Sequence, residues 1–554
     1  MKHRLLLILA AVQRPGDQHF RLIKYSQFPP LSLMTIAGLT PDHWEITVRD
    51  EHVESSEVEE DVDVVGIQCY ISSASRAYEL ARRWQWRGAK VVLGGLHPTS
   101  MPDEAAQHAD AVCIGPAETV WGRILDDYER GQLQKFYRGR SEGSAALVPP
   151  ARRDLMNPRA YLIRHTMVTS RGCPHACDFC YKSSFWGPTY YEPRPLAEVE
   201  RELSQIDDRL VFFLDDNLLA NRRHAHALFE VLRGSGIVWQ AAASLDVARD
   251  PRYLEEAYEA GCRSLFVGFE SLSPANMRGN NKPVNAATDY AEVCRRFHDT
   301  GIMINGSFVF GFDCDGPDVF DRTLEFTVEN KILTASFHVL TPLPGTPVFA
   351  RLEAEGRLLH RNWTLYDTYH AVFRPKGMTP EQLEEGYGRA KREFATCKSI
   401  LLRSLGLPGT LKRIAYNVAW TRMDPLWVAI IRAGLMPLAT RIFERVLQLS
   451  TKDQRRQHDP AMLQASAISD QPLVHPGAAA SEWTSLFALG APAAESCYPP
   501  GDSFIGVNSV DRGCSKSAFA SSPAESDRRH QMNSREAATR TEYHGWGRKS
   551  RRAE

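Results

Sequence analysis

The chain of 554 residues is 43% hydrophobic and 24% charged, and its formal net charge at pH 7 is −1. This length exceeds one ordinary core and predicts roughly three or four domains. The balanced charge lacks the basic surplus of nucleic-acid-binding proteins, so we expect no nucleic-acid partner.

Targeting signals and cysteine usage favour a cytoplasmic protein. The apolar run after the first methionine is short and soon meets Arg14 and Asp17, which favours a buried strand and turn over a signal peptide. No stretch reaches the roughly 20 apolar residues of a membrane span. Outside one cluster the cysteines stand singly, as in proteins with reduced thiols.

Residues 1–140 alternate short apolar runs with helices. The runs are RLLLILAAV, WEITVRD, DVVGIQCYI, KVVLGG and DAVCIG, which are hydrophobic enough for strands covered on both faces. The helix after the third run stops at Gly88. The pattern predicts a doubly wound, Rossmann-like α/β domain with its ligands beyond the carboxyl ends of the strands. A linker over 141–160 follows.

Residues 161–347 repeat the alternation in longer units. The strand candidates are HTMVTS, LVFFLDDN, WQAAASL, SLFVGFES, MINGSFVFGF and ASFHVLTPL. Six such units predict a partial (β/α)6, TIM-like barrel with its chemistry at the carboxyl ends of the strands. Polar residues stand at those ends: Asp215, Asp216 and Asn217 follow one strand, and Glu270 follows another.

The remainder of the chain divides into a helical region and a tail. Residues 348–450 are mostly helical, with a capping box from Thr379 to Gln382 and Pro380 at the first helical position. The stretch PLWVAIIRAGLMPLATRIF in this region favours a buried helix, and a peripheral membrane contact stays open. Residues 451–554 lose all periodicity and are predicted to be a disordered tail.

The densest chemical signal is TSRGCPHACDFCYKSSFWG, which holds Cys173, Cys177 and Cys180 in a C-x3-C-x2-C spacing. Thiolates spaced in this way on a loop after a strand bind a soft metal or an iron–sulfur cluster. A structural zinc site would need a fourth ligand, for which His175 or His165 is available. Three thiolates on a four-iron cube would instead leave one iron open to a ligand that is not protein.

This motif resembles the signature of the radical S-adenosylmethionine (SAM) enzymes, including the aromatic Phe179 before the third cysteine. The resemblance implies a [4Fe–4S] cluster on the three thiolates, with SAM on the open iron. One electron would then cleave SAM to a 5′-deoxyadenosyl radical. A reducing partner of the flavodoxin or ferredoxin type follows from this chemistry.

The resemblance also assigns SAM-binding residues in the barrel. Beside Phe179, these are Asp216, Asn217, Ser244 and Glu270. The usual Gly-Gly-Glu of the second strand is replaced here by Asp215-Asp216-Asn217, which puts the contact to the amino group of SAM in question. A solvated strand end or a helix cap explains any one of these residues equally well.

The N-terminal domain resembles the cobalamin-binding domain that precedes many radical SAM barrels, through the stretch GGLHPTSMPDEAAQHADAVCIGPAETVW. The implied site has a nucleotide-tail part and a corrin part, made of Ser72, Ser73, Gly94 and Gly95 and of His97, Pro98 and Glu118, respectively. IGPAE departs from the usual Gly-Glu-Gly-Glu. DEHVES lacks the glycine of the cobalt-ligating motif, so His52 is expected at the surface and cobalt without a histidine ligand.

The helical region resembles the uncharacterised domain found behind the barrel in many cobalamin-dependent members, some of which modify hopanoids. There, Tyr366, Tyr369, His370 and Arg374 are compatible with facing the substrate or with ordinary packing. Together these resemblances imply a cobalamin-dependent radical SAM methyltransferase that acts on an unactivated carbon of a small or lipid-like, hopanoid-type molecule. A radical SAM cyclase or rearrangement enzyme, and a cofactor-binding sensor without turnover, are the alternatives.

Overall fold

The computed structural model describes residues 3–12, 28–59, 61–157, 160–161 and 163–422, with the single residues 430, 435 and 438. The predicted tail over 451–554, and all but three residues of the apolar stretch after residue 424, lie outside the described residues.

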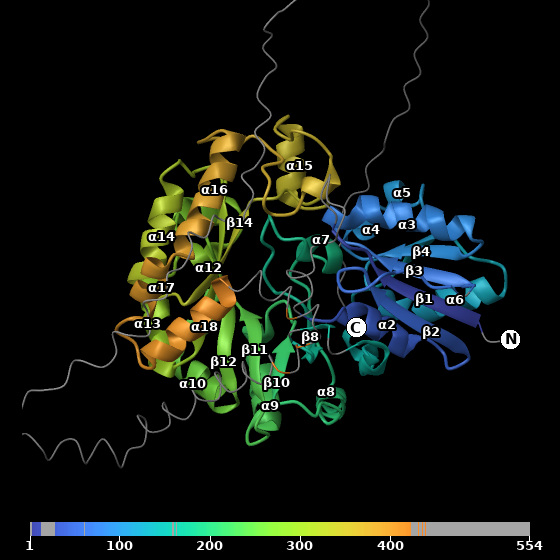
Figure 1. Ribbon diagram of the computed structural model, residues 1–554, viewed down its shortest axis with the longest axis horizontal. Helices are drawn as coiled ribbons and strands as arrows, with labels where there is room; N and C mark the ends of the chain where they lie inside the picture. Colours follow the sequence, from blue (N-terminus) through green and yellow to red (C-terminus); the bar gives the residue numbers. More distant parts are fainter. Residues whose placement is uncertain are drawn as a thin grey trace, which may run out of the picture. The chain divides into compact units, whose positions relative to one another are not determined.

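The N-terminal sheet has six parallel strands in the order β2-β1-β3-β4-β5-β6 (Figure 1). The strands are β1 (His3–Leu9), β2 (Trp44–Asp50), β3 (Val64–Gln68), β4 (Lys90–Gly94), β5 (Ala111–Ile114) and β6 (Phe136–Arg138). All five predicted strands are confirmed. β6 was missed because its three residues carry too short a hydrophobic pattern.

Helices cover both faces of this sheet, as a doubly wound fold requires. They are α2 (Leu31–Leu39), α3 (Ala74–Trp86), α4 (Leu96–Ser100), α5 (Pro102–Ala105) and α6 (Trp121–Glu129). Leu6 and Ile8 of β1 pack in one core with α3. Leu5 and Leu7 point to the other face, where α2 and α6 cover them. The alternation of side chains along a strand therefore builds two cores from one apolar run.

His52 corrects a prediction of the sequence. It is fully buried rather than at the surface. Its Nδ1 lies 2.8 Å from Asp50 Oδ1, and the Val12 backbone N–H donates to its Nε2 over 3.3 Å. No run of apolar residues around His52 in the sequence predicts its burial. The burial arises because the carboxyl end of β1 lies beside that of β2.

The second sheet is also parallel and follows the order β14-β13-β12-β11-β10-β7. Its strands are β7 (Thr166–Met167), β10 (Leu210–Phe213), β11 (Val238–Ala243), β12 (Cys262–Glu270), β13 (Met303–Phe310) and β14 (Thr334–Val339). Each strand pairs with its predecessor in the repeat, which confirms the partial barrel of six units. The core is rich in aromatic rings, with Phe269 and Phe308 stacked at 5.3 Å between centroids.

Helices join these strands and pack along the sheet (Figure 1). They are α8 (Leu196–Leu203), α9 (Arg222–Leu232), α10 (Pro251–Glu259), α11 (Pro274–Gly279), α12 (Pro283–Ala286), α13 (Tyr290–Thr300) and α14 (Val319–Glu329). An antiparallel hairpin of β8 (Ser170–Gly172) and β9 (Tyr191–Pro193) frames the cysteine loop and helix α7 (Lys182–Trp186). The hairpin was not predicted, because its strands of three residues alternate too briefly to be seen in sequence.

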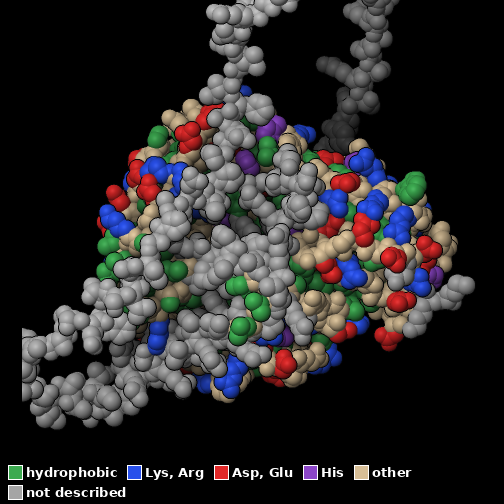
Figure 2. Space-filling view, in the orientation of Figure 1, with side chains coloured by type: hydrophobic (Ala, Val, Ile, Leu, Met, Phe, Trp, Pro, Cys, Tyr) green, Lys and Arg blue, Asp and Glu red, His purple; other side chains and the backbone are tan. Residues whose placement is uncertain are grey.

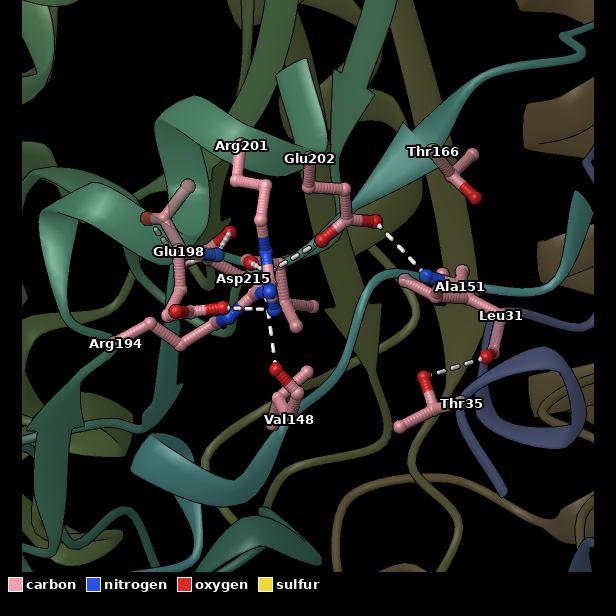
Figure 3. Close-up of polar contacts among 12 residues, drawn as sticks. Leu31, Thr35, Val148, Ala151, Thr166, Arg194, Glu198, Arg201, Glu202 and Asp215 are labelled. Carbon is pink, nitrogen blue, oxygen red and sulfur yellow. Dashed lines mark hydrogen bonds and ion pairs between the residues drawn. The ribbon is translucent and has the colours of Figure 1, made fainter. Parts of the chain in front are cut away.

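The segment before the barrel is fixed by a buried carboxylate, Glu202 of α8 (Figure 3). Arg194 donates to Glu202 over 2.7 Å and also to the carbonyl oxygens of Val168 and Val148. Arg153 donates to the same carboxylate over 2.7 Å, and the Ala151 N–H does so over 3.5 Å. These contacts tie the predicted linker to the first strand of the barrel.

The C-terminal region is helical, as predicted. It contains α15 (Pro347–Ala354), α16 (Pro380–Phe394), α17 (Cys397–Ser404) and α18 (Thr410–Arg422). The capping box at Thr379 is present, since Gln382 N–H donates to Thr379 Oγ1 and Thr379 N–H donates to Gln382 Oε1. Among the described residues no helix is both long and apolar enough to cross a membrane.

Candidate functional site

The carboxyl ends of the barrel strands gather most of the predicted site residues at one edge of the sheet. Asn217 follows β10, Ser244 follows β11 and Glu270 ends β12, and these three strands are neighbours. The cysteine loop leaves β8 directly after β7, the strand on the other side of β10. The parallel topology therefore brings together residues that are up to about a hundred positions apart in the sequence.

The three cysteines are reduced thiols within one short loop. Cys177 is buried, and Cys173 and Cys180 are partly exposed. Burial raises the pKa of Cys177 to about 12, against the opposing effect of Lys282, and burial likewise raises the pKa of Cys180. Across the described residues, no three His, Cys, Asp or Glu side chains converge tightly enough to hold a single metal ion. An all-thiol donor set on a loop is the chemistry that iron–sulfur clusters use.

Asp215 organises the base of this loop. Its carboxylate is buried and accepts the Thr169 N–H at 3.0 Å, the Thr169 hydroxyl at 2.9 Å and the Ser170 hydroxyl at 2.5 Å. Burial raises its pKa against these hydrogen bonds. Asp215 thus fixes the chain just before Cys173.

Asn217 carries the clearest sign of an unfilled polar position. Its side chain is 2% exposed, and its Nδ2 donates to Ser244 Oγ over 3.1 Å and lies 3.8 Å from Cys173 Sγ. Its Oδ1 is buried without a hydrogen-bond partner. A buried amide oxygen without a partner costs about 1–3 kcal/mol, which a donor such as an ammonium or hydroxyl group would relieve. The predicted SAM residues Asn217 and Ser244 therefore fit a polar ligand beside the thiols.

Asp216 is paired within the protein. Lys182, two residues after Cys180, places its ammonium 2.7 Å from Asp216 Oδ1 and 3.3 Å from the Asp216 carbonyl oxygen. Burial alone would lower the pKa of Lys182, but the nearby carboxylate of Asp216 outweighs burial and raises the pKa of Lys182. The pair links the third cysteine to the end of β10. A SAM contact of Asp216 would have to share the carboxylate with Lys182.

Glu270 ends β12 in an unusual conformation. Its φ of 62° lies in the left-handed region, and the register between β12 and β13 shifts at this residue. Such conformations cost about 1–3 kcal/mol in non-glycine residues and cluster at functional sites. Its carboxylate accepts from Lys282 over 2.6 Å. Lys282 was not predicted, because a lysine between α11 and α12 carries no motif that sets it apart.

Phe179 packs at the same edge. Its ring meets Phe312 edge-on at 5.6 Å between centroids, just beyond β13. The loop after β13 is held by buried Asp315, which accepts the N–H groups of Gly311 and Phe312 at 3.0 Å each. Phe179, which precedes Cys180 in the sequence, is partly buried and packs against the core of the barrel.

In the N-terminal domain, small residues meet at the carboxyl edge between β3 and β4. Ser72 and Ser73 lie in the turn after β3, Gly94 ends β4, and Gly95 follows it before α4. Gly95 has a φ of 103°, and a Cβ there would stand 2.8 Å from the Cys69 carbonyl oxygen. Ser73 is buried and its hydroxyl accepts the Tyr70 N–H at 3.1 Å. Ser72, Gly94 and Gly95 remain partly exposed, and a cofactor tail can lie against such backbone.

The residues predicted for the corrin side are all engaged with the protein. His97 is fully buried beside Pro98, with its Nε2 2.9 Å from the Tyr78 hydroxyl and 3.1 Å from Glu104 Oε1. Trp363 donates to the same Glu104 over 3.0 Å, which lowers the pKa of this carboxyl together with His97 and Tyr78, against burial. The other ring nitrogen of His97, Nδ1, is buried without a hydrogen-bond partner.

Glu118, the third predicted corrin residue, forms an ion pair with Arg171 of β8. In the helical region, Tyr366 is 2% exposed and belongs to the core, while His370 binds Asp367 at 3.0 Å. Packing therefore explains Tyr366. The roles of the remaining residues as ligands stay predictions.

A Rossmann-like domain followed by an open six-stranded barrel, with three thiols and an unsatisfied amide oxygen at the barrel's carboxyl edge, defines a class: radical SAM proteins with an N-terminal cofactor domain. Residues 25–125 match the B12 binding domain family, and residues 167–327 match the Radical SAM superfamily.

Individual relatives carry the assignment further. Bacteriochlorophyllide d C-12(1)-methyltransferase of Chlorobaculum tepidum is 32% identical over 392 residues, 68% of this chain and 85% of that protein. Hopanoid C-2 methylase of Rhodopseudomonas palustris is 26% identical, over 60% of this chain and 66% of that protein. The chain belongs to the cobalamin-dependent radical SAM methyltransferases. Its cofactors are a [4Fe–4S] cluster, SAM and cobalamin.

Solved structures agree in fold. The radical SAM methyltransferase TsrM of Kitasatospora setae, with cobalamin and a [4Fe–4S] cluster bound, superposes with a TM-score of 0.55 at 16% identity, over 82% of this chain and all of that one. The cobalamin-dependent radical SAM enzyme OxsB gives a TM-score of 0.56 at 13% identity, over 85% of this chain and 82% of that one.

Proposed function

We propose that this protein transfers a methyl group to an unactivated carbon of a small apolar molecule with a fused-ring or lipid-like framework. The observation that carries the proposal is the 32% identity to a bacteriochlorophyllide d methyltransferase, which spans 85% of that relative. Two further relatives support the same class of substrate. One is a second bacteriochlorophyllide d methyltransferase and the other is a hopanoid methylase, and both names refer to molecules with a large apolar part.

The protein's own residues would bind, orient and shield the cofactors. Cys173, Cys177 and Cys180 would hold the cluster, and Asn217 with Ser244 would accept and orient the polar part of SAM through the free Asn217 Oδ1. When bound, the cofactors supply one-electron cleavage of SAM and methyl transfer from cobalt.

The same proposal divides the chain by role. Residues 1–140 would bind cobalamin, with its tail along Ser72, Gly94 and Gly95, and residues 161–347 would hold the cluster and SAM. The linker over 141–160 joins them, and the helical region over 348–450 would complete the substrate site.

The test is anaerobic reconstitution of the full chain with iron, sulfide and cobalamin, followed by reduction in the presence of SAM. Bacteriochlorophyllide d and a hopanoid are offered separately as substrates. The proposal expects both 5′-deoxyadenosine and S-adenosylhomocysteine, with a product 14 mass units heavier than one of the substrates, a mass gain on the order of one CH2.

Other outcomes separate the alternatives. Release of 5′-deoxyadenosine alone, with a rearranged product, would establish the cyclase instead. A protein that binds cobalamin and cluster but never cleaves SAM with any substrate would be a sensor. A colourless protein that contains zinc would remove the cluster assignment itself.

A low-potential electron donor of the flavodoxin or ferredoxin type belongs to the proposal, because cleavage of SAM consumes one electron. Replacing dithionite in the assay by reduced flavodoxin tests it. Loss of all SAM cleavage with flavodoxin and with ferredoxin would exclude both donors.

We also propose that the turn between α17 and α18 touches an anionic membrane surface, where apolar substrates reside. Leu401, Leu402, Leu405 and Leu411 are exposed there by 46%, 38%, 43% and 82%. No acidic residue occurs between Glu393 and Asp424, whereas basic residues recur, among them exposed Lys398. Apolar tips with basic neighbours are the composition that binds anionic lipid surfaces. Figure 2 shows apolar side chains on the molecular surface over α17.

Flotation with vesicles of phosphatidylglycerol and phosphatidylcholine tests this contact. Leu402→Ser combined with Leu411→Ser should lower the bound fraction several-fold, whereas Leu147→Ser, which changes a leucine exposed by 47% in the linker, should not. Equal binding by all three proteins, or binding that ignores lipid charge, would refute it.

A further inference from the structure

The segment 280–282 between α11 and α12 forms hydrogen bonds with the cysteine loop on both sides of Cys177. The Asp178 N–H donates to the Asn280 carbonyl oxygen over 3.1 Å. Asn281 Nδ2 donates to the Ala176 carbonyl oxygen over 2.8 Å, and Asn281 takes a positive φ of 53° to do so. Asn280 is itself buried and donates to the Asn276 carbonyl oxygen over 2.9 Å. Both neighbours of Cys177 are thus held by one segment.

The next residue of this segment, Lys282, carries a buried positive charge to the same place. It is 7% exposed, and its ammonium donates to Glu270 Oε1 over 2.6 Å and to the Gly268 carbonyl oxygen over 3.1 Å. Burial would lower its pKa, but Glu270 and then Cys177 raise it, so the side chain is an ammonium. A Cβ at Gly268 would stand 2.3 Å from Glu270 Oε1 and 3.0 Å from Lys282 Nζ, so glycine is what admits the pair.

Stability alone is a weak reason for this pair. Burying two charges costs about as much as their attraction returns, and apolar replacements of such pairs are often neutral. Glu270 in addition adopts the left-handed conformation, which is unfavourable for glutamate. A strained, buried ion pair tied to the loop of a cluster ligand is therefore better explained by an effect on that ligand's cluster.

We infer that the positive charge of Lys282 raises the reduction potential of the cluster bound by Cys177, with Glu270 as its counter-charge. The inference rests on the cluster assignment made above and adds a residue that sets its redox behaviour. In the step concerned, a flavodoxin- or ferredoxin-type donor loses one electron and the cluster gains it, with no bond made or broken. A nearby cation stabilises the added negative charge, because net charge and burial set the potentials of iron–sulfur clusters.

Redox titration of the reconstituted full chain, monitored by the electron paramagnetic resonance signal of the reduced cluster and done without SAM, tests this. Lys282→Met should lower the reduction potential of the cluster by at least about 59 mV. For one electron this corresponds to a tenfold change in the reduction equilibrium. Glu270→Gln should shift it the opposite way, and Lys282→Arg should keep it near the wild-type value. Opposite signs for the two halves of one ion pair are the mark of an electrostatic effect, which a merely structural role would not produce.

Lys331→Met is the matched control. Lys331 also donates to a backbone carbonyl, that of Leu402 over 2.7 Å, but it precedes β14 at the amino edge of the sheet. An unchanged potential in both Lys282→Met and Glu270→Gln would overturn the inference, as would equal shifts in Lys282→Met and Lys282→Arg.

Two further results are distinguishable. If Lys282→Met fails to retain iron, Glu270→Gln still decides the matter by the sign of its shift, with Lys282→Arg expected to stay near the wild-type potential. If the wild-type protein takes up no cluster, the proposed function fails, and that failure is separate from a cluster whose potential ignores Lys282.

Discussion

The two parallel sheets end in contrasting ways at their carboxyl edges. Between β3 and β4 of the N-terminal sheet, the edge presents Gly94, Gly95 and Ser72, which are partly exposed. At the barrel, the edge presents side chains that already hold one another, such as Lys182 with Asp216 and Lys282 with Glu270. One topology thus yields an edge lined by small, partly exposed residues and an edge lined by paired charged side chains.

The contrast matches the cofactors of the family. Cobalamin is bulky, and small residues at the edge of a sheet would leave room for it. A cluster and SAM are compact and charged, so their site needs fixed charges and satisfied partners. Asn217 Oδ1 stands out at the barrel edge because it is a buried acceptor still without a donor.

The largest effect should come from removing a thiol at the barrel edge. Cys177→Ala should lower iron bound after anaerobic reconstitution by about tenfold or more, since loss of supporting partners alone costs metal sites 10–100-fold. Cobalamin binding should persist. Cys314→Ala, at an exposed cysteine, is the control and should bind iron normally. Iron assays that give equal contents for the two variants would contradict the role of Cys177.

The next effect concerns the predicted cobalamin site in the N-terminal domain, where Gly95 is replaced. Gly95→Val places a side chain at a φ of 103°, 2.8 Å from a carbonyl oxygen, and should cost about 1–3 kcal/mol of strain. Cobalamin affinity, measured by absorbance titration, should fall while iron content stays. Gly122→Ala in α6, where a Cβ meets nothing within 4 Å, is the control. Normal cobalamin binding by a folded Gly95→Val protein would place the cofactor elsewhere.

A smaller effect should follow from the contact between Trp363 and Glu104 in the N-terminal domain. Trp363→Phe removes the donor to Glu104 while keeping an aromatic ring, and should lower the free energy of unfolding by about 1.5 kcal/mol, as for hydrogen bonds to charged groups. Denaturant titration measures this. Trp86→Phe, at a tryptophan exposed by 89%, should change it little. Identical midpoints for both variants would show that the Glu104 contact contributes nothing.

The smallest effect concerns pH at the barrel edge. Burial alone would raise the pKa of Asp313, but Arg357, Lys376 and Arg351 lower it to about 2. Since this is below the unfolded value, the contribution to stability exists above about pH 4 and is lost as pH falls toward about 2. Partial exposure limits it to about 1 kcal/mol. Asp313→Asn should flatten this part of the curve of stability against pH, and an unchanged slope would argue against the ion pairs.

Local patterns carried much of the prediction. Both sheets, the capping box and the cysteine motif follow from short-range rules of periodicity, helix capping and spacing. The hairpin of β8 and β9 was missed because three-residue strands have too few alternations to register. The burial of His52 was missed because it depends on Val12 and Asp50, which arrive from two different strands.

The sequence by itself determined the fold class, the two cofactor domains and the three thiols, because each is encoded in residues close together along the chain. Only the tertiary structure decided which polar residues are already occupied: Asp215 by Thr169, Asp216 by Lys182 and Glu270 by Lys282. Hydrogen bonds and ion pairs between strand ends depend on distances in space, and the position of a residue in the sequence does not contain them.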